Sequence, residues 1–232
     1  DEAGFTAAMT EARERSRAHQ KFYDDDGEWT VLAEGGGRGF AGYGLERLTT
    51  TVQRWRPLSE EGAFELVLDQ TPLYAESGGE VADQGRIEGP GFSIAVEDVQ
   101  SINGIIHHRG TLVEGSVALE PGDEVLVVVD TARRAKKTIH HSATHLMHAA
   151  LKAVLGPHVE QKGSVVDPDR TRFDFSHPEA LTVEQVEAVE AWVNARIRAN
   201  EPVVVTEGVA LDDAKAQGVT ALFGEKYGDE VR

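Results

Sequence analysis

The chain has 232 residues, of which 40% are hydrophobic and 27% charged, a composition typical of a folded globular protein with one large or two ordinary domains. No apolar run approaches the length of about eighteen residues expected of a membrane span, and the first residues lack the basic region and apolar core of a signal peptide. With no cysteine there is no disulfide framework, so we expect a cytoplasmic protein without a membrane partner. Because neither end of the sequence has a recognisable terminal feature, we also expect a piece of a longer protein.

The negative charge is concentrated in the first part of the sequence. The net charge is −17, which by itself argues against nucleic-acid binding. Residues 1–130 hold 10 Lys and Arg against 25 Asp and Glu, whereas residues 131–232 hold 13 against 15. The second part is nearly balanced and has its own basic cluster, so the overall charge does not exclude an RNA partner there.

Residues 1–23 are predicted to form a helix, because Phe5, Met9 and Ala12 recur on one face before a charged run. A solvated helix that packs by its first two turns is the plain interpretation. Three aspartates and a glycine, residues 24–27, then end the helix and open a loop.

Residues 24–130 are predicted to form a small antiparallel β-barrel or sandwich, because short runs of alternating apolar and polar residues are separated there by glycine. Asn103-Gly104 lies between two such runs and is a strong hairpin signal, because both central positions of that turn need positive φ. The expected strands are 29–33, 45–55, 63–68, 92–99, 105–113 and 124–129.

A glycine-rich segment, residues 69–85, differs from an ordinary strand or turn. Its glycine pair lets the backbone take positive φ or approach a ligand closely, and polar side chains surround the pair. A polar loop that caps one end of the barrel explains the segment equally well. The residues singled out are Ser77, Gly78, Gly79 and Asp83, with Glu76 and Glu80 beside them.

A helix is predicted to begin near residue 131, with Asp130 or Thr131 as its N-cap. Its first two turns carry four cations, which oppose the helix macrodipole and cost about 0.3 kcal/mol or more each. An anionic partner such as RNA phosphate would offset that cost, although a solvated basic face is an equally good explanation. The four cations are Arg133, Arg134, Lys136 and Lys137.

Three histidines of the same helix, His141, His145 and His148, fall four and then three residues apart and therefore share one face. His141 and His145 can both reach one metal ion, although zinc normally takes at least three protein ligands. His148 would need a distorted helix to join them, and polar or RNA-facing histidines are the alternative. The opposite face is apolar and suited to packing: Ile139, Ala143, Leu146, Ala150 and Val154.

Gly156-Pro157 is predicted to end this helix, and Thr182 and Gln185 form a capping box for a second one. The expected elements are a hairpin over 158–166 and 171–175, a helix over 182–200, a strand over 202–209 and a short helix over 211–217. The inward side chains of the 182–200 helix are expected to be Val186, Val189, Val193 and Ile197. This order of elements predicts a two-layer α+β domain.

Several motifs resemble, in order and spacing, those of alanyl-tRNA synthetases. The run His140-His-Ser-Ala-Thr-His-Leu-Met-His-Ala-Ala-Leu151 resembles the signature of their editing domain, and Tyr74-Ala-Glu-Ser-Gly-Gly79 looks like the glycine-rich signature of the barrel before it. The helix carrying Phe5 and Met9 is similar to the connector out of the family's tRNA-recognition domain. The later matching motifs are Gln161-Lys-Gly-Ser164, Arg172-Phe-Asp-Phe-Ser-His177 and Leu222-Phe-Gly-Glu-Lys-Tyr-Gly228, so the resemblance covers essentially the whole chain.

The resemblance implies an α+β fold in three parts: a connector helix (1–23), a small antiparallel β-barrel (24–130) and a two-layer α/β editing domain (131–232), truncated before its last two zinc ligands. Full-length members join alanine to tRNA(Ala) with ATP and Mg²⁺ in a catalytic domain that is absent here. The part present is expected to hydrolyse tRNA(Ala) mischarged with serine or glycine, and no DNA partner is indicated. The alternatives are a stand-alone trans-editing hydrolase, which the connector helix disfavours, and a non-catalytic tRNA-binding module.

The resemblance also implies roles for single residues. His141 and His145 match the family's first two zinc ligands; the other two come from a Cys-x-x-x-His motif that this chain does not reach, so zinc is expected to bind weakly here or to be absent. Thr144 and Gln161 match catalytic positions that line the editing pocket, and Arg172 lies near it. The tRNA phosphates would be held by Arg172 and the four helix cations, and a water polarised by zinc or placed beside it would attack the ester.

Overall fold

The computed structural model describes residues 27–219, 230 and 231 of the chain. The helix expected over 1–23 and the motif at 222–228 lie outside the described residues. The chain divides into two compact units, Asp1–Lys136 and Lys137–Arg232. In the described parts of both units, no helix is at once long and apolar enough to cross a membrane.

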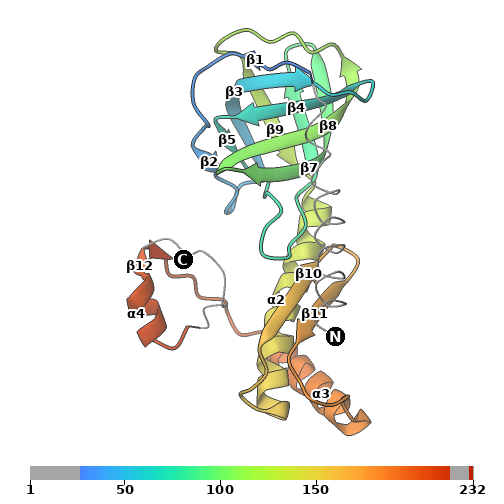
Figure 1. Ribbon diagram of the computed structural model, residues 1–232, viewed down its shortest axis with the longest axis vertical. Coiled ribbons are helices and arrows are strands. Elements are labelled where there is room, and N and C mark those ends of the chain that lie inside the picture. Colours follow the sequence, from blue (N-terminus) through green and yellow to red (C-terminus); the bar gives the residue numbers. More distant parts are fainter. Residues whose placement is uncertain (1–26, 220–229, 232) are drawn as a thin grey trace, which may run out of the picture. The chain divides into compact units, whose positions relative to one another are not determined.

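Six antiparallel strands of the first unit close into a barrel (Figure 1). They follow the order β3-β4-β8-β7-β6-β9, and β9 pairs back with β3, which removes the exposed edges of an open sheet. The predicted antiparallel barrel is therefore confirmed. The six strands are β3 (Arg47–Pro57), β4 (Ala63–Leu68), β6 (Gly85–Gly89), β7 (Phe92–Ile102), β8 (Ile105–Gly115) and β9 (Glu124–Val129). The two-residue strands are β1 (Thr30–Val31), which pairs with β3, and β2 (Gly39–Phe40) and β5 (Gln70–Thr71), which pair with each other in parallel.

Most strand positions agree with the sequence prediction. β4 and β9 begin and end at the predicted residues, and β3, β7 and β8 overlap theirs with small shifts. The predicted hairpin turn is confirmed, because Asn103 has φ 52° and Gly104 has φ 82°. β6 was not predicted: it has a single buried apolar residue, Ile87, between charged neighbours and glycines, which is too short a pattern to recognise.

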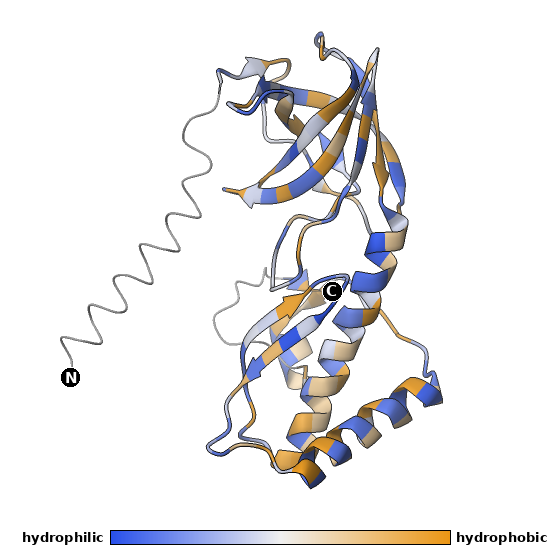
Figure 2. Cartoon of the chain, turned by 90° about the vertical axis from the view of Figure 1, so that its right-hand side faces the viewer, coloured by the Kyte–Doolittle hydropathy of each residue, from blue (hydrophilic) through white to orange (hydrophobic). Residues whose placement is uncertain are grey.

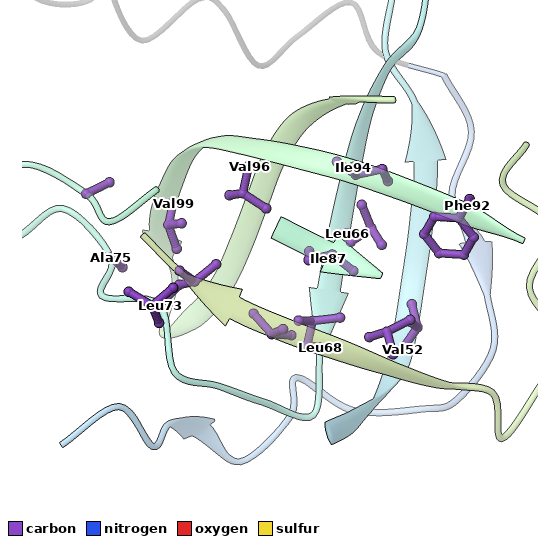
Figure 3. Close-up of a cluster of buried hydrophobic side chains, with 14 of the residues drawn as sticks. Val52, Leu66, Leu68, Leu73, Ala75, Ile87, Phe92, Ile94, Val96 and Val99 are labelled. Atoms are coloured by element: carbon purple, nitrogen blue, oxygen red, sulfur yellow. The ribbon is translucent and has the colours of Figure 1, made fainter. Parts of the chain in front are cut away.

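The barrel interior is filled by alternate side chains of its strands (Figure 3). This alternation appears in Figure 2 as changes of colour along each strand. A fully buried aliphatic side chain contributes about 1.5–3 kcal/mol, so this core is the main source of the unit's stability. Its members include Val52, Leu66, Leu68, Leu73, Ile87, Phe92, Ile94, Val96, Val99, Val125, Val127 and Val129, with Ile106 and Leu112 of β8 packed against them.

A carboxylate is buried on the outer face of the same barrel. Glu65 of β4 lies in register between Arg56 of β3 and Arg109 of β8 and is fully buried. Glu65 Oε2 accepts hydrogen bonds from Arg56 at 2.7 Å and Arg109 at 3.3 Å, and Oε1 lies 2.8 Å from His107 Nδ1. Burial alone would raise the pKa of Glu65, but the hydrogen bonds from His107 and Arg56 and the charge of Arg109 outweigh it and lower the pKa to about 2.

Helix α2 (Thr131–Leu155) carries the histidines and begins at the predicted place. Asp130 Oδ1 accepts a hydrogen bond from the Arg133 N–H at 2.9 Å, which makes Asp130 the N-cap. Gly156, with φ 117°, follows its last residue, as predicted. The predicted hairpin forms from β10 (Gln161–Val166) and β11 (Thr171–Phe175), and Figures 1 and 2 both show it alongside α2.

Helix α3 (Val183–Ala199) confirms the predicted capping box. The Gln185 N–H donates to Thr182 Oγ1 at 3.3 Å, and the Thr182 N–H donates to Gln185 Oε1 at 2.9 Å. The prediction that its apolar residues point inward is wrong for Val186 and Ile197, which are 41% and 54% exposed. No residue of α3 is buried, because the described residues offer its apolar stripe no matching surface.

The strand predicted over 202–209 is wrong except at its end. Only β12 (Val209–Ala210) forms there and pairs with β13 (Glu230–Val231), while the predicted short helix is confirmed as α4 (Leu211–Ala216). A β-branched run becomes a strand only where another strand edge pairs with it, and no described strand pairs with residues 202–208. A complete two-layer domain stays a prediction; the layers seen are α2 and the β10–β11 hairpin.

A buried histidine makes the barrel sensitive to acid. His108 of β8 is 1% exposed; its Nδ1 donates to the Leu66 carbonyl at 3.2 Å, and its Nε2 accepts from the Thr71 hydroxyl at 2.8 Å. Burial lowers the pKa of His108 from 6.5 to about 4. As the pH falls below 6.5, the unfolded chain binds a proton that the folded barrel excludes, so the stability of the barrel falls from about pH 6.5 to pH 4.

We predict that His108→Gln removes this part of the pH dependence, which amounts to about 3 kcal/mol over the whole interval. The measurement is the free energy of unfolding from urea denaturation between about pH 7 and pH 4.5, followed by the fluorescence of Trp29 and Trp55. His158→Gln, at an exposed histidine of the other unit, is the control and should leave the slope unchanged. An equally steep slope in His108→Gln would show that another group sets the acid sensitivity.

Candidate functional site

The helical spacing of α2 brings the predicted histidines onto one face. The ring centres of His141 and His145 are 5.0 Å apart with their planes inclined by 27°, and both side chains are exposed. His148 is half-buried, and its ring lies 5.1 Å from that of Phe173 in β11. Partial desolvation of the His145 ring, which keeps one part in solvent, and the neighbouring His141 lower the pKa of His145 and favour the neutral, ligand-competent imidazole.

The metal donors found on this face fall short of a zinc site. A catalytic zinc ion takes three protein ligands and a structural one takes four. Within residues 27–219, 230 and 231, no group of three or more His, Asp or Glu side chains is arranged to hold a metal ion. His141 and His145 would supply two of the four ligands of a tetrahedral site, and their role as zinc ligands stays a prediction.

The hairpin presents a second set of predicted residues to the same helix. Directly opposed residues of an antiparallel pair lie on the same face, and here Gln161 opposes Phe175 while Val166 opposes Thr171. That face meets α2, because Thr171 contacts Thr144 and Phe173 contacts His148. Thr144 and His148 of α2 therefore meet this face of the hairpin, and Gln161 lies on the same face at the other end of the strand pair from Thr171. The catalytic role of Thr144 and Gln161 stays a prediction.

Thr144 is the best-defined polar group of this interface. It is 7% exposed, and its Oγ1 lies 2.8 Å from the His140 carbonyl and 2.6 Å from Thr171 Oγ1. One turn nearer the start of α2, His140 Nδ1 donates to the Asp167 carbonyl at 2.5 Å. The sequence did not single out Thr171 or His140 for these contacts, because neither residue type signals a tertiary hydrogen bond by its spacing.

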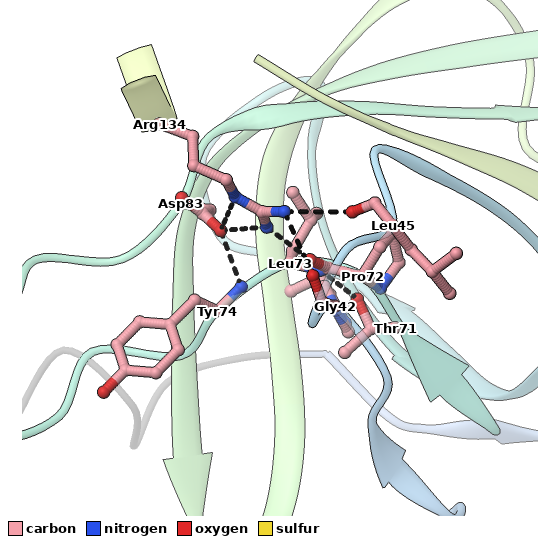
Figure 4. Close-up of polar contacts among 9 residues, drawn as sticks. Gly42, Leu45, Thr71, Pro72, Leu73, Tyr74, Asp83 and Arg134 are labelled. Atoms are coloured by element: carbon pink, nitrogen blue, oxygen red, sulfur yellow. Dashed lines mark hydrogen bonds and ion pairs between the residues drawn. The ribbon is translucent and has the colours of Figure 1, made fainter. Parts of the chain in front are cut away.

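One of the predicted tRNA-binding cations is held inside the first unit (Figure 4). Arg134 donates to Asp83 Oδ2 at 3.0 Å through Nε, and also to the carbonyls of Leu45, at 3.0 Å, and of Gly42 and Pro72. Asp83 is only 2% exposed. Most of the hydrogen-bonding capacity of Arg134 is therefore used within the chain.

The other predicted tRNA-binding cations differ in their solvent exposure. Lys137 is fully buried, Arg133 is half-buried and Lys136 is exposed. Arg172 is exposed and forms an ion pair with Asp174 at 3.2 Å. A tRNA-binding role for these residues stays a prediction, and exposure favours Lys136 and Arg172.

The glycine-rich segment forms a tight turn at Ser77–Glu80, and hydrogen bonds of Asp83 hold the chain beside it. Gly78 and Gly79 have φ of 59° and 84°, which confirms the predicted positive φ, and Ser77 and Glu80 exchange backbone hydrogen bonds across them. Asp83 accepts from the Tyr74 N–H at 2.9 Å as well as from Arg134. This geometry matches the interpretation as a polar loop.

We predict that Arg134→Ala lowers the free energy of unfolding of the first unit by about 3 kcal/mol, because it leaves the buried Asp83 carboxylate without its cation. The measurement is urea denaturation at neutral pH. Arg38→Ala is the matched control: Arg38 pairs with Asp69 but is 71% exposed, so its loss should lower the free energy of unfolding far less than Arg134→Ala does. Equal effects of the two substitutions would contradict a structural role for the Arg134 contact.

Comparison with known proteins agrees with these features. The family described as tRNA synthetases class II (A) matches residues 1–133, more than half of the chain. The whole chain is 48% identical over 245 residues to the Alanine--tRNA ligase of Bordetella pertussis, 46% over 243 residues to that of Bordetella petrii and 48% over 243 residues to that of Bordetella parapertussis. The chain spans about a quarter of the length of these curated relatives, since each alignment covers 27% of the relative. The chain belongs to the class II tRNA synthetase family, as a fragment of the alanyl-tRNA synthetase type.

Proposed function

We propose that this chain is the editing portion of an alanine–tRNA ligase and hydrolyses tRNA(Ala) mischarged with serine or glycine. The observation that carries the proposal is the buried Thr144 hydroxyl at the helix–hairpin interface, next in sequence to His145. The relatives named Alanine--tRNA ligase are nearly four times as long. The joining of alanine to tRNA with ATP and Mg²⁺ belongs, in this proposal, to a domain outside the chain.

The need for such a site follows from the physics of discrimination. A pocket shaped for alanine excludes larger amino acids, but it gains only about 1–3 kcal/mol from the single methyl that glycine lacks. It also rejects the added hydroxyl of serine poorly. A second, hydrolytic site that selects by a different property is therefore required.

The residues of the interface suit that selection. A hydroxyl at the Thr144 position can exchange a hydrogen bond with the hydroxyl of a serine ester. The methyl of an alanine ester offers no such hydrogen bond, and the Thr144 hydroxyl then keeps only its contacts with the His140 carbonyl and Thr171. In the proposal, the Gln161 amide holds the ester, and Lys136 and Arg172 contact tRNA phosphates.

Zinc enters this proposal only as a partner of His141 and His145. The described residues supply two of its ligands, and at least one more must come from elsewhere. The same shortage supports a second candidate, a tRNA-binding module without catalytic activity. A stand-alone trans-editing hydrolase is disfavoured by the family match to residues 1–133.

The test is deacylation of Ser-, Gly- and Ala-tRNA(Ala) by a protein that carries these residues and continues through the Cys-x-x-x-His ligands. We predict hydrolysis of the first two and not of the third. Thr144→Val, which removes the hydroxyl but keeps the shape, should lower Ser-tRNA(Ala) hydrolysis by about tenfold. Ser142→Ala, an exposed hydroxyl of the same helix, is the control and should change nothing.

A folded, zinc-loaded protein that spares Ser-tRNA(Ala) would refute the editing proposal. If the same protein still binds tRNA(Ala), the non-catalytic module becomes the better interpretation.

A further inference from the structure

Two threonine hydroxyls at the helix–hairpin interface have more hydrogen-bond contacts than protons. Thr144 Oγ1 lies 2.8 Å from the His140 carbonyl, Thr171 Oγ1 lies 3.1 Å from the Val165 carbonyl, and the two hydroxyl oxygens are 2.6 Å apart. A carbonyl can only accept, and each hydroxyl has one proton to donate. Only two of these three contacts can therefore be hydrogen bonds at one time.

The shared contact allows two arrangements. In the first, Thr144 donates to the His140 carbonyl and Thr171 donates to Thr144. In the second, Thr144 donates to Thr171, and Thr171 donates to the Val165 carbonyl. Only the second leaves both lone pairs of Thr144 Oγ1 without an internal donor.

The oxygen positions of both hydroxyls are fixed by the surrounding chain. Thr144 is 7% exposed within α2, and Thr171 is the first residue of β11, where it pairs with Val166. His140 Nδ1 donates to the Asp167 carbonyl at 2.5 Å and ties α2 to the turn that leads into β11. Because the oxygens are held in place, the arrangement of the two protons is the remaining variable.

We infer that Thr171 is a specificity-determining positioning residue: its hydroxyl sets the direction of the Thr144 hydroxyl and so tunes the response to a hydroxylated aminoacyl group. The inference rests on the proposed function. Either arrangement leaves Thr144 a lone pair for a serine hydroxyl, but the second leaves two and joins serine, Thr144, Thr171 and the Val165 carbonyl in one relay of hydrogen bonds. Hydrogen bonds in such a chain strengthen one another. A glycine ester has no hydroxyl and does not enter the relay.

The experiment compares Thr171→Val, which keeps the shape of the side chain, with Thr171→Ser, which keeps the hydroxyl. Both are made in the full-length synthetase that carries this segment, and kcat/KM is measured for deacylation of Ser- and Gly-tRNA(Ala). We predict that Thr171→Val lowers the Ser-tRNA(Ala) value by about tenfold and leaves the Gly-tRNA(Ala) value within about twofold. Thr171→Ser should restore the Ser-tRNA(Ala) value to within about threefold of the unsubstituted enzyme.

An equal loss for both substrates in Thr171→Val would indicate a merely structural role and overturn the inference, as would no loss for either. A second measurement, threonine-methyl NMR of the 232-residue chain, is independent of activity. Thr171→Val should shift the Thr144 methyl and populate a second χ1 rotamer, whereas Thr171→Ser should not. If the unsubstituted enzyme spares both esters, the proposed function fails by itself, and the Thr144 rotamer still decides whether Thr171 positions it.

Discussion

A single guanidinium joins the start of α2 to two other segments of the first unit, the loop at Gly42 and Leu45 and the glycine-rich segment 69–85. Arg134 donates to the Asp83 carboxylate and to three loop carbonyls, those of Gly42, Leu45 and Pro72. Loop carbonyls need donors when they are buried, and the planar guanidinium, with five N–H groups, can serve several acceptors at once where a lysine could not. Because Asp83 also accepts from the Tyr74 N–H, this contact fixes both the first turn of α2 and the base of the glycine-rich turn.

In the described part of the second unit, side-chain hydrogen bonds join α2 to the hairpin beside a small set of buried apolar residues, Ala150, Leu151, Val159 and Val166. Its helix and hairpin meet through Thr144 with Thr171 and through His140 with Asp167, while α3 buries no residue. Polar contacts of this kind are costly when unsatisfied and directional when satisfied, so they define positions more sharply than apolar packing does. Such an interface suits a site that must distinguish one hydroxyl group.

The sequence revealed local features well and tertiary ones poorly. The Asn103-Gly104 turn, the Asp130 N-cap and the Thr182 capping box were all predictable because each depends on residues close together in the chain. The conformation of residues 202–208 was not predictable, because a strand forms only where another strand pairs with it, and the local sequence pattern does not show whether such a partner is present. At the candidate site, helical spacing gave the histidine face, but the partner of Thr144 lies 27 residues further on in β11.

At the start of α2, the unfavourable interaction of cations with the helix macrodipole is partly offset by a carboxylate of the same chain. Cations in the first turns of a helix oppose its macrodipole, which suggested an anionic partner. For Arg134 that anion is Asp83 of the same unit, so this residue gives no evidence for RNA. Arg172 has its own carboxylate, Asp174, but at an exposed site where the pair is weak and a phosphate could compete. Lys136 is exposed, so its position in the helix keeps the original argument for an external anion.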